Sequence, residues 1–299
     1  MKKIRFENDL GYSIEFVDKE SHRNSSYILE KLDGNGLVGE ANAVKIPGRD
    51  GAVTYNLTRG QRSVSIECAV ISTGDKNKWM KQTQAENRDF VARCFDPKYF
   101  GTLYYYAYEG DTGKKIYCRP TGSPADDPDF NNLFKFKLGF LSDDAFWEKV
   151  EALFAALGMV HNNYRFPHFM GGASAFAFVY GKAVIYNPTL YDIFPVVTVY
   201  NSEIPVNVVN VNTGKFLKFK IPTEENRRIV IDIKNITATL EENINGSWQY
   251  KENVIHYLTL DSRITDFVIV PGHNEFKIET AEGANPTLTI TAHEPVMGV

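Results

Sequence analysis

The sequence predicts a mainly β protein with two β-sandwich domains, and three observations carry this prediction. Alternating apolar and polar residues recur along most of the 299 positions, which places one face of each strand in a core and the other in water. Turn-forming residues separate these segments, as at 212–214 and 271–274. The length exceeds what one small core serves, so we expect two domains of about 150 residues each.

The first domain is expected to span residues 1–145. Its candidate strands are 4–7, 13–17, 27–32, 53–57, 61–70, 102–108, 115–119 and 133–140. One helix is expected at about 75–95, because apolar residues there recur every three to four positions and Asp96-Pro97 then stops the run. Residues 120–129 are rich in turn formers and are interpreted as a hairpin loop.

A linker is expected at 146–187, before a second domain at 188–299. Residues 145–158 have apolar positions at helical spacing and end in Gly158, so they predict a connecting helix. An irregular stretch with proline and glycine follows at 166–174. Regular alternation then returns, most clearly at 216–221 and 228–234, and predicts a second domain made of strands.

Composition excludes several classes of function. The net charge of −4 arises from 37 acidic and 33 basic residues with no basic stripe, so stable nucleic-acid binding is not expected. No apolar run approaches the roughly 18 residues that span a bilayer. Residues 1–9 turn polar before the core of a signal peptide could form, so we expect no membrane contact and folding in a cytoplasm. Cys68, Cys94 and Cys118 are interpreted as buried thiols.

Two motifs suggest ligands but lack the context that each requires. Gly34, Gly36 and Gly39 match the spacing of a dinucleotide-binding loop, yet Pro47-Gly48 would end the helix that must follow, so a loop or turn is expected. His161, Asn163 and Arg165 match the pattern with which galectins bind a galactoside. The expected companion motif is missing, because Trp248 is followed by Lys251 and Glu252 out of register, and we interpret the match as coincidence.

No catalytic, cofactor-binding or metal-binding residue is predicted. The histidines never form a pair four residues apart beside a carboxylate, so zinc ligation has no local support. Adjacent carboxylates in a strand point to opposite faces and do not form an acid/base pair; these are Asp126-Asp127, Glu224-Glu225 and Glu241-Glu242. We therefore do not expect an enzyme.

The order of several short motifs resembles the distal tail protein family of long-tailed bacteriophages that infect Gram-positive hosts. In the first domain the resemblance lies in the turn at 46–51, the segment 56–66 and a helix that carries Trp79. In the second domain it lies in 187–188, 194–199, 209–214, 230–232 and 270–276. The resemblance covers the whole length of the chain.

The resemblance implies a particular architecture and function. The N-terminal β-sandwich, with one helix and an extended hairpin, would assemble six copies into a ring, and a C-terminal galectin-like jelly-roll sandwich would project outward. The last strand would return toward the first domain. The homo-hexamer would be a hub with a channel for DNA, and its partners would be the major tail tube protein, the tail-associated lysin or tip protein and receptor-binding proteins. It would lie in the virion, at the tail tip or baseplate, after assembly in the host cytoplasm.

Two other classes of function stay open. A carbohydrate-binding module for host cell-wall saccharides is the alternative, since the second domain is expected to be galectin-like. A glycan-cleaving enzyme is the third, although the sequence offers it only unpaired carboxylates.

Overall fold

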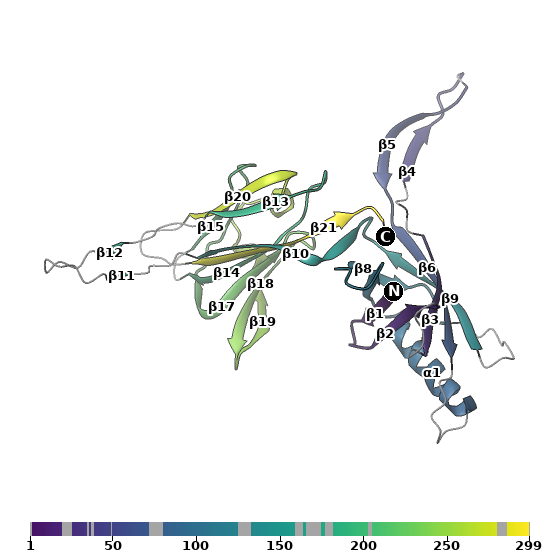
Figure 1. Ribbon diagram of the computed structural model, residues 1–299. Helices are drawn as coiled ribbons and strands as arrows, with labels where there is room; N and C mark the ends of the chain where they lie inside the picture. Colours follow the sequence, from purple (N-terminus) through teal and green to yellow (C-terminus); the bar gives the residue numbers. More distant parts are fainter. Residues whose placement is uncertain are drawn as a thin grey trace. The chain divides into compact units, whose positions relative to one another are not determined.

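The computed structural model divides into two compact units and is mainly β, as the sequence predicted (Figure 1). Unit 1 contains Met1–Glu151 and Pro295–Val299, and unit 2 contains Ala152–Glu294. The structure describes residues 2–19, 26–34, 36, 39–48, 50–71, 80–124, 133–158, 164–165, 175–176, 182–202, 205–279 and 286–298. The return of residues 295–299 to unit 1 is what the family resemblance implied for the end of the chain.

Unit 1 is a β-barrel closed by seven of its described strands. Their hydrogen-bonded order is β7-β1-β2-β3-β6-β9-β8, and β8 also pairs with β7, which closes the sheet. The pairs are antiparallel except for β2 with β3. The strands are β1 Lys3–Asn8, β2 Ser13–Asp18, β3 Tyr27–Asp33, β6 Arg62–Ile71, β7 Gly101–Tyr106, β8 Lys114–Pro120 and β9 Leu133–Ser142. The closure through Arg119↔Leu141 and Pro120↔Phe140 turns the predicted sandwich into a barrel and removes the sheet edges.

Aromatic residues fill the interior of unit 1. Phe6, Phe16 and Phe140 from three strands surround Phe95, with ring centroids 5.3–6.0 Å apart in the pairs Phe6–Phe95, Phe16–Phe95 and Phe95–Phe140. Phe95 directly follows helix α1 (Met80–Cys94), which confirms the predicted helix within the described residues. The Asn8 side chain donates to the carbonyl oxygen of Cys94 at 3.2 Å, which satisfies an acceptor that the helix end leaves unpaired.

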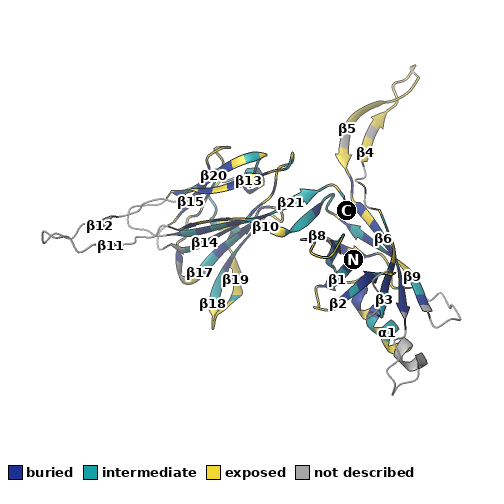
Figure 2. Ribbon diagram, in the orientation of Figure 1, coloured by how far each residue is buried: buried dark blue, intermediate teal, exposed yellow. Residues whose placement is uncertain are grey.

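Two further strands extend from unit 1 as a hairpin, which we call the arm. β4 (Gly39–Val44) pairs antiparallel with β5 (Val53–Arg59) and forms a separate two-stranded sheet. The arm projects away from the barrel (Figure 1), and the side chains that the structure describes along it are exposed (Figure 2). The extended hairpin that the resemblance implied is therefore present.

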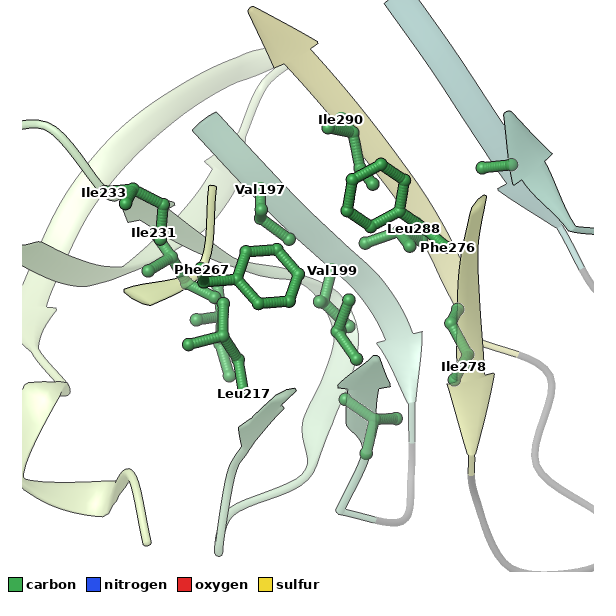
Figure 3. Close-up of a cluster of buried hydrophobic side chains, with 14 of the residues drawn as sticks. Val197, Val199, Leu217, Ile231, Ile233, Phe267, Phe276, Ile278, Leu288 and Ile290 are labelled. Atoms are coloured by element: carbon green, nitrogen blue, oxygen red, sulfur yellow. The ribbon is translucent and has the colours of Figure 1, made fainter. Parts of the chain in front are cut away.

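Unit 2 is a sandwich of two sheets around one hydrophobic core. The larger sheet has the order β19-β18-β17-β14-β21-β10 and the smaller one β13-β20-β15-β16. Val197, Ile231 and Leu288 from the larger sheet pack with Leu217 and Phe276 from the smaller sheet (Figure 3). The strands are β10 Trp147–Gly158, β13 Ala183–Asn187, β14 Val196–Ser202, β15 Asn207–Asn210, β16 Phe216–Lys218, β17 Thr223–Asp232, β18 Thr237–Ile244, β19 Ser247–Asn253, β20 Gly272–Glu279 and β21 Thr287–Val296.

Short elements complete unit 2. A two-residue pair joins β11 (Tyr164–Arg165) to β12 (Ala175–Phe176). Two 3-10 helices, η2 (Ile255–Tyr257) and η3 (Ile264–Asp266), lie in the segment between β19 and β20. Backbone hydrogen bonds between Ile193 and Ile269, at 3.0 and 2.9 Å, hold this irregular segment beside the start of β14.

Three buried asparagines of unit 2 hold three successive residues of that irregular segment. Asn210 donates to the carbonyl oxygen of Val268 at 2.9 Å, and Asn187 donates to that of Ile269 at 3.0 Å. Asn274 donates to the carbonyl of Val270 at 2.6 Å and accepts from the Val270 N–H at 3.0 Å. A segment outside the sheets cannot satisfy its buried backbone groups through a ladder, so amide side chains satisfy them instead.

The connecting helix predicted at 145–158 is wrong, because strand β10 occupies 147–158. Trp147, Ala155 and Leu157 are buried at odd positions, and Phe154 is 63% exposed, which is the period of two of a strand. The alanines favoured a helix, but pairing with β8 through Glu148↔Lys115 overrides a weak local propensity. Strands β10 and β13 thus occupy the two ends of the segment 146–187 that was expected to be a linker.

Candidate functional site

The arm is the most exposed element of unit 1 and the strongest candidate for an assembly surface. Val44 and Val53 face each other across the two strands and are 51% and 44% exposed, and Tyr55 is 69% exposed. An isolated two-stranded hairpin is at best marginally stable in water, and exposed apolar residues mark contact sites. The arm therefore has the properties of a segment that another protein surface covers.

The base of the arm is fixed to the barrel by side chains at the end of β5 and just before β6. The Arg59 guanidinium lies over the Phe146 ring, 4.9 Å from its centroid, and Gln61 donates to the Asp143 carboxylate at 2.6 Å. Gly60 is buried, and a Cβ there would lie 2.3 Å from Oε1 of Glu40. The motif at 56–66, on which the resemblance partly rested, thus contains the residues that attach the arm.

Arg62 continues this segment into the barrel end. It is 1% exposed and lies in phase with the buried residues Val64 and Ile66 of β6. Its Nε donates to the carbonyl oxygen of Ala145 at 2.9 Å, and its Nη2 to that of Met297 at 2.6 Å. Burial lowers the pKa of Arg62 below its usual value, although an arginine stays charged in proteins. The buried guanidinium therefore donates to two backbone carbonyls, one at Ala145 before β10 and one at Met297 near the C-terminus.

The burial of Arg62 was not predicted from the sequence, although its position in β6 indicates it. An arginine at an inward position of an otherwise apolar alternation must find several acceptors, because burial of an unpaired charge is costly. The same part of unit 1 holds Lys114, whose Nζ donates to the carbonyl oxygen of Gly298 at 3.1 Å. The residues after β21 are therefore held by two cations from the barrel.

The outer face of the barrel carries an interleaved row of charges and tyrosines. Lys3 pairs with Glu15 at 3.3 Å and lies 4.7 Å from the ring centroid of Tyr106. Arg5 lies 5.7 Å from the ring centroid of Tyr104, which is its cross-strand partner. Tyrosine and arginine are enriched in protein interfaces, so this face is a second surface suited to a partner.

The described residues contain no feature that supports catalysis at the cysteines or at a metal. Burial raises the pKa of Cys94 to about 11 and raises the pKa of Cys68 and Cys118 well above the usual range, so these thiols are poor nucleophiles at neutral pH. No group of three His, Cys, Asp or Glu side chains in the described ranges could hold a metal ion. A helix long and apolar enough to cross a membrane is also absent from them.

The structure describes the three glycines of the first ligand-like motif but only part of the second motif. Gly34 has a φ of +85°, and a Cβ there would lie 2.3 Å from the carbonyl oxygen of Ser63, so this glycine permits a close approach of two chain segments. Strand β4, and no helix, begins at Gly39, which agrees with the predicted turn. His161 and Asn163 lie outside the described residues, and Arg165 belongs to β11.

Comparisons with known proteins identify a fold. No protein-family model matches the sequence, and no curated protein matches it. Among solved structures, the crystal structure of the phage SPP1 Dit protein (gp 19.1), described as a paradigm of the hub adsorption apparatus in phages that infect Gram-positive hosts, has a TM-score of 0.60 at 12% identity. It covers 98% of this chain and 99% of that chain.

Two baseplate structures are also similar. The phage P2 baseplate in its activated conformation with Ca has a TM-score of 0.59 at 13% identity and covers 100% of both chains. The same baseplate with Sr has a TM-score of 0.55 at 13% identity and covers 97% of this chain and 98% of that chain. The matches thus extend over both units. This chain has the fold of the phage tail hub proteins that its sequence resembles.

Proposed function

We propose that this chain is a structural protein of a phage tail, a homo-hexameric hub ring that links the distal end of the tail tube to the tail tip or baseplate. The full-length likeness in fold to a hub protein and to baseplate chains supports the proposal. Within the chain, the strongest support is the arm, whose side chains are exposed wherever the structure describes them. A projecting arm that contacts the next copy makes the head-to-tail interface from which closed rings are built.

The proposed partners follow from the position of such a ring. It contacts further copies of itself, the major tail tube protein, and the tail-associated lysin or tip protein, and receptor-binding proteins dock on it. DNA passes through its channel, and the near balance of 33 basic and 37 acidic residues suits a passage that does not retain DNA. The galectin-like interpretation of unit 2 stays a prediction.

The experiment measures the mass of the purified full-length chain by light scattering over a broad concentration range. A hexamer has about 200 kDa, six times the 33.8 kDa of one chain, and negative-stain images should show six-fold rings with an open centre. A monomer at every concentration contradicts the proposal.

A pair of variants tests the arm itself. Val53→Lys places a charge on the arm, and a lysine covered by a neighbouring copy without a partner is costly, so the hexamer should dissociate into smaller species. Val184→Lys is the matched control, because Val184 is a similarly exposed strand valine, 55% against 44%, in unit 2. Hexamers that survive Val53→Lys, or that dissociate equally with both variants, contradict a role of the arm in assembly.

A further inference from the structure

The outward face of the larger sheet of unit 2 carries a row of aromatic and charged residues. Tyr200 is the cross-strand partner of Arg228, Arg228 of Glu241, and Glu241 of Tyr250, so the row runs across β14, β17, β18 and β19. The preceding row, with Val199, Ile229 and Leu240, is buried in the core. Because side chains alternate along a strand, the row that begins at Tyr200 points away from the core.

Trp248 joins this row and completes what we call the aromatic cluster: Tyr200, Arg228, Glu241, Trp248 and Tyr250. Trp248 lies two residues before Tyr250 on β19 and therefore on the same face. The Arg228 guanidinium lies 4.4 Å from the Trp248 ring centroid and 5.9 Å from that of Tyr200, and the two rings meet edge to face at 5.9 Å. Tyr250, at the edge strand, is 66% exposed.

Hydrogen bonds hold the polar groups of the aromatic cluster in place. Both Nε and Nη2 of Arg228 contact the same carboxylate oxygen, Oε2 of Glu241, at 2.7 and 2.6 Å. The side chains of Arg228 and Glu241 are 23% and 21% exposed, so the pair is partly desolvated yet reachable. A planar guanidinium and a carboxylate, fixed beside two aromatic rings, form a preorganised set of donors and acceptors.

The charge of the aromatic cluster limits the chemistry of its ligand. Arg228 and Glu241 neutralise each other, so an anion gains little from the arginine and is repelled by the carboxylate. A ligand that suits both partners is neutral and carries adjacent hydroxyl groups, which can donate to Glu241 and accept from Arg228. A ligand that also suits the rings has an apolar face. The ring of a neutral sugar has both properties.

We propose that the aromatic cluster of unit 2 is a binding site for neutral saccharides, with Tyr250 and Trp248 contacting the sugar ring and Arg228 and Glu241 its hydroxyl groups. The site is made of residues other than 161–165, which the galectin pattern singled out, and it does not depend on ring assembly. Because the aromatic cluster lies on an outward sheet face and Tyr250 is 66% exposed, binding of a single disaccharide is weak, with a Kd of about 1 mM.

The test titrates lactose, cellobiose and maltose separately into the full-length chain and records heat and tryptophan fluorescence. At least one of these neutral disaccharides should bind and change the fluorescence. Trp248→Phe should abolish that change, since the other two tryptophans, Trp79 and Trp147, belong to unit 1. Tyr250→Ala should weaken binding about tenfold, which is the effect of losing one stacking contact of about 1.4 kcal/mol. Glucose 6-phosphate, an anionic comparator, should bind more weakly than the best disaccharide.

Tyr186→Ala is the matched control for Tyr250→Ala. Tyr186 is 55% exposed on the outward side of the smaller sheet of unit 2, on strand β13, and its loss should leave saccharide binding unchanged. Circular dichroism of each variant separates lost binding from lost folding. Absence of binding by all three disaccharides overturns the proposal, and so does binding that Tyr250→Ala does not weaken. If Tyr250→Ala changes only the mass in light scattering, the aromatic cluster is a protein contact and not a saccharide site.

Discussion

The Nη2 of Arg62 donates to the carbonyl oxygen of Met297 across 235 positions of sequence, at a distance of 2.6 Å. The arginine belongs to a strand of the barrel in unit 1, and Met297 follows the last strand of the chain. Since the guanidinium is buried and also binds Ala145, it joins three separate segments of unit 1. The stability of this unit should therefore depend on residues near the C-terminus.

Replacement of Arg62 by alanine should destabilise unit 1 by about 3 kcal/mol, because it removes a buried side chain together with its hydrogen bonds to Ala145 and Met297. Urea unfolding, followed by near-ultraviolet circular dichroism, measures the loss. Arg62→Lys keeps the charge but lacks the planar fork and should recover part of it. Arg93→Ala, an exposed residue of the same unit, should change stability by less than about 0.5 kcal/mol. Equal effects of Arg62→Ala and Arg93→Ala contradict the role assigned to the buried guanidinium.

Asn274→Asp should destabilise unit 2 by about 2–4 kcal/mol. The side chain is 0% exposed and donates through Nδ2 to the carbonyls of Val270 and Gly272, and aspartate replaces that donor with a buried acceptor or charge. Thermal unfolding measures the effect. Asn235→Asp is the control, since Asn235 is exposed and donates to the side chain of Asp232 at the surface. An unfolding temperature of Asn274→Asp equal to that of the control contradicts the role of Asn274 in holding the irregular segment.

The three cysteines should be unreactive toward a thiol reagent while the protein is folded. With the pKa of Cys94 raised to about 11, only about one thiol in a thousand is ionised at about pH 8, and burial blocks access to all three. Colorimetric labelling should therefore be slow in buffer and should give three thiols per chain in denaturant. Labelling of any cysteine within seconds in buffer contradicts the packing of the barrel.

Asp111→Ala should destabilise unit 1 at neutral pH and have little effect in acid. The carboxylate accepts from the N–H groups of Ala107 and Gly113 at 2.7 and 3.2 Å, and these bonds lower its pKa. A lowered pKa means that the stabilisation is present above the unfolded value of 3.8 and disappears as the pH falls through the folded value. The loss should be about 1–2 kcal/mol at about pH 7 and near zero at about pH 2. A loss that does not change with pH points to a cause other than the carboxylate.

The sequence predicts the strands best where one face alone is buried. Residues 61–70 and 133–140 were predicted from alternation, and they form most of β6 and β9, which pair along their whole length. The helix was predicted because Phe90, Val91 and Cys94 recur at helical spacing, and it lies where expected within the described residues. These elements succeed because their local pattern and their tertiary environment agree.

Other features depend on pairings that no local pattern records. The parallel contact of β2 with β3 and the closure of β8 on β9 are choices of partner among strands of similar alternation. The residues 145–158 fit a helical period equally well, and only pairing within the sheets makes them a strand. The aromatic cluster was invisible for the same reason, since Tyr200, Arg228 and Trp248 come from three strands.

Unit 1 takes its residues from both ends of the described chain, so unit 2 can diversify separately from it. Unit 2 has the topology of an insertion, with its only junctions near Glu151 and Glu294. Insertions with two short junctions can be exchanged between relatives while the host domain keeps its own core. A recombinant that carries a foreign sandwich between these junctions should still form the barrel, so the specificity of one unit could evolve without altering the architecture of the other.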